Sequence, residues 1–302
     1  MLDLGALSNC FSNSACLVTQ SATGVIIGML LFLVASGVTL IFGVLHVVNF
    51  AHGAFYMIGA YVAYSTYGVT GNYYVAVLVG TIAAAIVGVL FERSAISRVY
   101  KENLLMQLLV CYAFVLICDD AVKIIWGSEY LAMGVPDEFR VRPWRIAGGV
   151  VPPFYLFLAG TALMVAVLSL ILIRYSRFGK IVRAAAANPT MVSVLGIRVP
   201  IYFATLFGLG CGLAGMAGAL AAPVRSLTPG MGLSILIESF IVTVIGGMGS
   251  IPGALLAALL LGFTRAFGSL GFPLFVDGAM FLMMVVILVF RPQGLLGERA
   301  GR

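Results

Sequence analysis

Residues 22–45 read ATGVIIGMLLFLVASGVTLIFGVL, an uninterrupted apolar stretch without a single charged side chain. A helix that crosses the hydrocarbon core of a bilayer needs about 20 such residues. Further apolar runs follow near residues 54–69, 73–91, 104–126, 151–173, 201–222, 234–249, 253–272 and 276–290. The pattern predicts an all-α, polytopic transmembrane helical bundle with about eight to nine membrane segments, of which 54–69 and 234–249 are short or interrupted.

The composition of the whole chain supports a membrane solvent. Hydrophobic residues make up 62% and charged residues 9% of the 302 positions, whereas soluble domains have roughly 45–50% and about 25%. A water-soluble fold of this composition would expose large apolar patches. We therefore expect one transmembrane domain over residues 1–302, surrounded by lipid, with no separate soluble domain.

The positions of lysine and arginine predict the orientation. Most of these residues lie in the loops 92–103 and 174–200 and in the tail from Arg291 onward, and basic loops stay in the cytoplasm. The net charge of +6 is explained in this way without a nucleic-acid partner. The C-terminus is then cytoplasmic, and the basic-free segment 1–21 and the loop 127–150 lie outside. Cys10 and Cys16 either form a disulfide there or remain free thiols.

Two breaks interrupt the apolar pattern, HVVNFAHG at 46–53 and GGMGSIPG at 246–253. Short segments interrupted by glycine or proline in the two halves of a transporter indicate the substrate path, because backbone groups freed there must face a cavity or protein. The candidate path residues in these breaks are Asn49, His52, Gly53, Gly247 and Gly249. Ordinary tight turns at the cytoplasmic surface are the alternative interpretation.

Glu238 is a further candidate for the path. It follows the outward-facing turn at 229–232 by about one helical turn and could line the upper part of the path. The alternative is a pairing role for both Glu238 and Arg265, with one another or with Asp277.

Asp119, Asp120 and Lys123 lie near the outer end of the run 104–126. At this spacing the lysine shares a helix face with either aspartate, so a structural pair is expected. An ion-coupling site is the competing interpretation, because charges within a membrane are costly and often functional.

No pattern of a catalytic or metal site stands out. His46 and His52 lie in the first break, but no carboxylate or cysteine joins them at metal-ligand spacing, so we predict no metal site. The sequence has no nucleophilic triad, redox motif or GxxxxGK[ST] phosphate loop. We expect a protein that is not an enzyme and binds no cofactor itself.

The loop 174–200 contains the signals of a short helix. Asn188 suits the N-cap, Pro189 the first helical position and Gly196 the residue after the helix end, which predicts a helix from Pro189 to Leu195. A helix this short is unstable in water unless it packs on something. The apolar residues on one of its faces fit a groove on a cytoplasmic partner or the protein's own helix ends; they are Met191, Val194 and Leu195.

Three motifs carry a resemblance to a known family, and the resemblance spans nearly the whole chain from about Gly24. They are GVLHVVNFAHG at 43–53 with GAY at 59–61, RAAAANP at 183–189 with LGI at 195–197, and GGMGSIPG at 246–253 with FRPQG at 290–294. The sequence resembles the LivH-type permease subunits of branched-chain amino acid ABC importers. The stretch 1–20 has no counterpart in this resemblance.

The resemblance implies that the whole chain is one permease domain and that this domain is one member of a larger assembly. Its other members are a second, related permease, two cytoplasmic ATPases that hold ATP-Mg, and a periplasmic substrate-binding protein. The loop 174–200 would be the ATPase-coupling loop, and the motif places five of its residues in the coupling region: Gly179, Arg183, Asn188, Pro189 and Gly196.

The function implied is ATP-driven uptake, across the bacterial inner membrane, of branched-chain or other small amino acids. The same family architecture also serves urea and short-chain amides, which is one alternative. An alternative of a different class is an ion-coupled secondary transporter that works alone and uses Asp119, Asp120 or Glu238.

Overall fold

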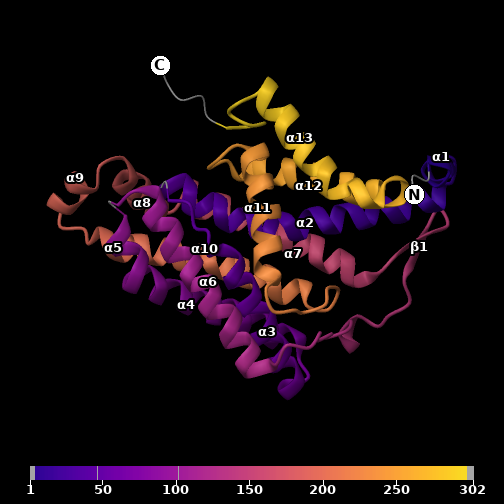
Figure 1. The fold of residues 1–302 in the computed structure, drawn as a ribbon, viewed down its shortest axis with the longest axis horizontal. Coiled ribbons are helices and arrows are strands. Elements are labelled where there is room, and N and C mark those ends of the chain that lie inside the picture. Colours follow the sequence, from indigo (N-terminus) through magenta and orange to yellow (C-terminus); the bar gives the residue numbers. More distant parts are fainter. Residues whose placement is uncertain (1–3, 46, 101, 298–302) are drawn as a thin grey trace.

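Figure 1 shows a bundle of helices in which the long helix α2 runs through the molecule. The computed structural model describes residues 4–45, 47–100 and 102–297. The helices that correspond to the apolar runs are α2 (Ser14–Leu45), α3 (His52–Thr70), α4 (Tyr73–Phe91), α6 (Leu104–Trp126), α7 (Pro153–Arg174), α10 (Val199–Ala221), α11 (Met231–Gly246), α12 (Ile251–Gly271) and α13 (Val276–Phe290). The shorter helices and the strands are α1 (Leu4–Ser12), α5 (Ser97–Val99), α8 (Arg177–Ala187), α9 (Pro189–Val194), β1 (Trp144–Ile146) and β2 (Gly149–Val151), with a π-helical turn at Glu92–Ile96 and 3₁₀ turns at Asp137–Phe139 and Pro273–Phe275.

Helix α2 begins at Ser14, earlier than the apolar run that predicted it. The side chain of Asn13 accepts a hydrogen bond from the Ala15 backbone N–H at 2.9 Å, which satisfies one donor at the helix start. The hydroxyls of Thr19 and Thr23 donate to carbonyls one turn earlier, each at 2.9 Å. Polar residues before position 22 therefore extend the helix although they do not belong to the apolar run.

Small residues bring the central helices into close contact. Helix α2 packs against α7, α10, α11 and α12. A Cβ atom at Gly28 would lie 2.8 Å from the Ala258 carbonyl oxygen of α12, and one at Gly212 would lie 3.2 Å from the Ala85 Cβ of α4. The Gly208–Gly212 pair of α10 thus faces α4, which is the close helix packing that small residues four apart favour in membranes.

Among the described residues, six helices are long and apolar enough to span a membrane by length and composition: Ser14–Leu45, Tyr73–Val99, Pro153–Arg174, Val199–Ala221, Ile251–Gly271 and Pro273–Phe290. The all-α polytopic fold is confirmed, and the predicted number of eight to nine spanning segments is not. Helix α11, the predicted short segment 234–249, has 16 residues, so its length is about 24 Å against a hydrocarbon core of roughly 30 Å. Helix α3 is rich in tyrosine and hydroxyl side chains, and α6 carries three charged residues.

The segments predicted to share one side of the membrane gather at one end of the bundle. In Figure 1, α5, α8 and α9 lie at one end, and α1 and β1 lie at the opposite end. The hairpin β1–β2 contacts the start of α2, because the Val150 N–H donates to the Thr19 hydroxyl at 3.1 Å. Leu131 pairs through its backbone with Leu227 in the loop between α10 and α11. The predicted outer loops therefore meet one another.

Cys10 and Cys16 form a disulfide, which decides between the two states considered for them. The other cysteines are buried: Cys111, Cys118 and Cys211.

We expect that a thiol reagent applied to the purified native protein labels no cysteine rapidly, because Cys10 and Cys16 form a disulfide and the other cysteines are buried. A reducing agent should then free two thiols, of which the half-buried Cys16 reacts faster than Cys10, which is 3% exposed. Labelling counted by intact mass spectrometry measures this. A Cys10→Ser/Cys16→Ser double variant should stay unlabelled after reduction. Two fast-reacting thiols without a reducing agent would contradict the bond.

Candidate functional site

The first break is a buried junction between α2, α3 and α11. The Asn49 side chain accepts a hydrogen bond from the Ala51 backbone N–H at 3.0 Å and so shapes the turn that starts α3. The Nε2 atom of His52 lies 3.1 Å from the Val34 carbonyl oxygen of α2. Asn49 and His52 are 1% and 0% exposed. Gly53 packs against the backbone of Gly232 in α11. His46, the other histidine predicted in this break, lies outside the described residues.

The second break is a glycine turn between α11 and α12. Gly247 and Gly249 have φ angles of +98° and +90°, a conformation that residues with a Cβ rarely adopt. Ser250 then caps α12 by accepting a hydrogen bond from the Gly253 N–H at 3.2 Å. The Leu295 N–H donates to the Ile245 carbonyl at 2.8 Å, so the segment after α13 lies against this turn.

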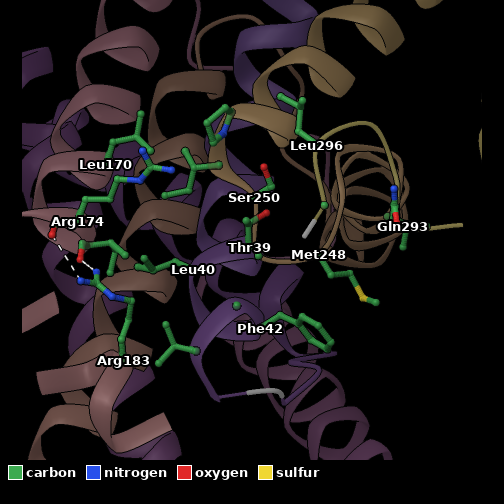
Figure 2. A pocket seen from close by; sticks show the side chains of 18 of the residues that line it. Thr39, Leu40, Phe42, Leu170, Arg174, Arg183, Met248, Ser250, Gln293 and Leu296 are labelled. Carbon is green, nitrogen blue, oxygen red and sulfur yellow. Dashed lines mark hydrogen bonds between the residues drawn. The ribbon is translucent and has the colours of Figure 1, made fainter. Parts of the chain in front are cut away.

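A large cavity of about 1690 Å³ lies beside the second break (Figure 2). Gly249 lines it, whereas Gly247 and the three candidates of the first break lie outside its lining. Apolar side chains form much of the wall, with polar groups among them: Thr39, Arg174, Arg183, Ser250 and Gln293. The cavity therefore lies between the second break, through Gly249, and the predicted coupling loop 174–200, through Arg174 and Arg183.

Gly179 and Arg183 fix α8 to the end of α7. The Ser176 hydroxyl caps α8 by accepting from the Gly179 N–H at 2.9 Å. The Arg183 guanidinium donates to the carbonyl oxygens of Ile173 and Arg174, which are free acceptors at the C-terminus of α7. A Cβ at Gly179 would lie 2.7 Å from the Ile173 carbonyl carbon. Both residues thus have contacts within this chain.

Helix α9 has the predicted caps and presents the predicted apolar face. The Asn188 side chain accepts from the Met191 N–H at 3.0 Å, Pro189 occupies the first turn, and Gly196 has a φ of +80°. The helix ends at Val194, just before the predicted Leu195. Val192 alone is buried and packs with Ala185 and Val199. The predicted docking residues are 62%, 78% and 73% exposed: Met191, Val194 and Leu195.

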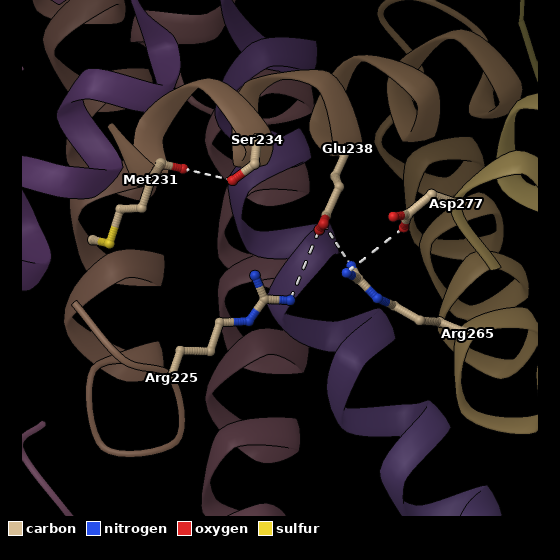
Figure 3. Close-up of polar contacts among 6 residues, drawn as sticks. All are labelled: Arg225, Met231, Ser234, Glu238, Arg265 and Asp277. Atoms are coloured by element: carbon tan, nitrogen blue, oxygen red, sulfur yellow. Dashed lines mark hydrogen bonds and ion pairs between the residues drawn. The ribbon is translucent and has the colours of Figure 1, made fainter. Parts of the chain in front are cut away.

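Glu238 lies in a network of charged side chains (Figure 3). Its Oε1 is 2.5 Å from Arg265 Nη1, and its Oε2 is 3.8 Å from Arg225 Nη2. Arg265 Nη2 also lies 3.9 Å from Asp277 Oδ1. The pairing of Glu238 with Arg265 was the predicted alternative to a path role. Arg225 was missed, because it lies in the loop after α10 and no periodic pattern links it to α11.

Lys123 pairs with Asp120 through a 3.0 Å contact on the outside of α6. The two side chains are 47% and 70% exposed, so the pair is well accessible on this surface. The structural pair expected from the spacing is present.

These features define a class of protein: a polytopic helical membrane protein with two interrupted segments, a large cavity beside one of them and a short helix presented at one end. Residues 21–290 match the family described as branched-chain amino acid transport system, permease component. The chain belongs to this family, and the family predicted from the sequence motifs is confirmed. Together with its apolar helices, this membership makes it a multi-pass inner-membrane protein.

Curated relatives match over almost their full length. The high-affinity branched-chain amino acid transport system permease protein BraD of Pseudomonas aeruginosa is 30% identical, and its counterpart LivH of Escherichia coli is 32% identical. In both cases the match covers 92% of this chain and 95% of the relative. Among solved structures, PsaBC from Streptococcus pneumoniae in complex with Fab has a TM-score of 0.47 at 11% identity, with 95% of this chain and 94% of that chain covered.

Proposed function

We propose that this chain is the permease subunit of an ATP-driven importer and that its solute is a branched-chain or another small amino acid. The observation that carries the proposal is the family match over residues 21–290, which includes both breaks and the loop 174–200. The relatives BraD and LivH are named as permeases for branched-chain amino acids. Urea or a short-chain amide is the alternative solute.

The proposed assembly contains a second, related permease, two cytoplasmic ATPases that hold ATP-Mg, and a periplasmic substrate-binding protein. The exposed apolar face of α9 supports an ATPase contact, because apolar side chains at a cytoplasmic end gain from burial in a partner's groove. Val192 holds α9 on this chain while the face formed by Met191, Val194 and Leu195 remains open.

The proposed orientation places the N-terminus outside and the C-terminus in the cytoplasm. The loops rich in lysine and arginine fit the cytoplasmic side. The Cys10–Cys16 disulfide lies near the opposite end and fits an oxidising periplasm.

In the proposed mechanism, closure of the ATPases on ATP moves α9, and this movement changes which side of the membrane the path faces. The contacts suggest the route. Helix α9 packs on α8, Arg183 ties α8 to the end of α7, and Arg174 and Arg183 line the cavity beside the second break. We propose that the two breaks bracket the solute path, with Gly249 at the cavity, Gly247 supporting its turn, and Asn49, His52 and Gly53 forming a fixed junction.

We expect the chain reconstituted alone in liposomes to move no leucine, isoleucine or valine, and uptake to appear only when the partner ATPases, the second permease, the binding protein and ATP are supplied. Energy enters at the ATPases, and this chain has no phosphate loop of its own. Radiolabelled uptake measures this. Robust uptake by the lone chain under a proton or sodium gradient would instead make it a secondary transporter. Competition by urea or acetamide and not by leucine would change the solute.

A further inference from the structure

A second, smaller cavity lies near the loop between α10 and α11, where that loop meets α3. Its volume is about 210 Å³, which is below the roughly 300–1,000 Å³ of pockets that hold drug-sized ligands. It therefore suits a small molecule. The loop that borders it pairs with Leu131 of the segment 127–150 through Leu227, so the cavity is at the end of the bundle proposed to face outward.

Arg225 supplies a positive charge to the wall of this cavity. In the described part of the chain, its ionic partner is Glu238 at 3.8 Å, which is beyond hydrogen-bond distance. Glu238 is held much more closely by Arg265, at 2.5 Å. Arg225 also forms a side-chain hydrogen bond with the Tyr56 hydroxyl. Because a guanidinium has five N–H donors, Arg225 keeps further donors for another anion, and its planar fork matches a carboxylate. Figure 3 shows Arg225 reaching from the loop toward α11.

The rest of the lining offers both acceptors and apolar surface. The Ser234 hydroxyl donates to the Met231 carbonyl at 2.9 Å, so its oxygen lone pairs remain free to accept from an ammonium group. Thr228 adds a further hydroxyl group to the lining, and the Tyr56 hydroxyl there faces Arg225. Apolar residues complete the wall, among them Ala221, Leu227 and Ile235.

We propose that this cavity holds the solute as one amino acid with an aliphatic side chain. Its carboxylate binds Arg225, its ammonium group binds hydroxyl oxygens including that of Ser234, and its side chain lies among the apolar residues. The inference rests on the proposed function, and it names where an importer of this kind would hold its solute before the path opens inward.

The test uses an engineered thiol in the cavity wall. Ser226 is exposed and lines the cavity, and the native cysteines are either disulfide-bonded or buried. In a Ser226→Cys variant of the full chain in membranes, leucine at about ten times its dissociation constant should slow modification by a small methanethiosulfonate about tenfold, by mass action. Acetamide, which has no carboxylate, and tryptophan, which is too large, should not protect. Equal protection by either, or none by leucine, would overturn the proposal.

Substitutions at Arg225 test the carboxylate contact. In the Ser226→Cys background, Arg225→Gln should raise the leucine concentration needed for protection by at least about tenfold, because a charge-assisted hydrogen bond is lost. Arg225→Lys should retain part of the protection. Arg145→Gln is the matched control, since Arg145 is an exposed arginine of β1 near the same end. Unchanged protection in Arg225→Gln would overturn the assignment.

This test and the test of the proposed function fail separately. Suppose that the assembled wild-type transporter takes up leucine with ATP but that leucine does not protect the engineered thiol of the Ser226→Cys variant. This result would refute the proposed binding cavity and leave the proposed importer function standing. If leucine protects the thiol but ATP drives no uptake, the proposed importer function is refuted and the proposed binding cavity stands.

Discussion

Replacement of Gly53 by valine is expected to abolish the accumulation of folded permease. A Cβ at position 53 would lie 2.6 Å from the carbonyl carbon of Gly232, a distance that real Cβ atoms do not show. The obstacle is backbone, so α3 and α11 would have to separate. Because membrane helices associate through close packing of small residues, the loss of this contact removes much of what holds the two together. The yield of monodisperse protein extracted in mild detergent measures the effect.

Gly68→Val is the matched control for this prediction. Gly68 lies on the same helix, and a Cβ there would meet nothing within 4 Å. This variant should accumulate as the wild type does. If Gly53→Val also accumulates and assembles normally while solute uptake falls, then Gly53 faces an open path and the junction seen in the structure is not its role.

Leu195→Asp is expected to reduce coupling between ATP hydrolysis and uptake by at least about tenfold. Burial of one leucine in a partner contributes about 1.5–3 kcal/mol, a carboxylate in the same groove adds a desolvation penalty, and about 1.4 kcal/mol already corresponds to a factor of ten. Leu195 is 73% exposed, so the substitution disturbs little within this chain. Uptake, solute-stimulated ATP hydrolysis and the amount of ATPase that co-purifies measure the effect.

Ser193→Asp introduces the same charge on the other side of α9 and is the control for Leu195→Asp. Ser193 is exposed, and its position on the helix is about half a turn from the face formed by Met191, Val194 and Leu195. It should leave coupling nearly unchanged. Normal uptake and normal co-purification in Leu195→Asp would mean that the ATPase docks elsewhere.

Features set by neighbouring residues could be predicted from the sequence. The apolar runs became helices, and the caps of α9 were predicted by Asn188, Pro189 and Gly196, because helix ends depend on local backbone groups. The pairing of Asp120 with Lys123 is likewise local.

Contacts between distant segments could not be predicted in the same way. Arg225 meets Glu238, and Leu295 meets Ile245, only because whole helices are arranged in a particular way. The arrangement depends on glycines such as Gly28 and Gly53, which let the backbones of two helices approach closely. The residues that they contact cannot be identified from the periodicity of the sequence. The two cavities are what this packing leaves unfilled, so they too were absent from the sequence prediction.

The segment 127–151 connects the start of α2 to the loop after α10. It is bonded to α2 through Val150 with Thr19 and through Ala147 with Ser14, and to the loop after α10 through two backbone bonds between Leu131 and Leu227. Any opening at this end must break these bonds or displace α2 and α10 together. Because α2 and α10 also pack directly on each other, the segment adds a second, hydrogen-bonded connection between them at this end, and one spectroscopic label on the hairpin would report a movement of either helix.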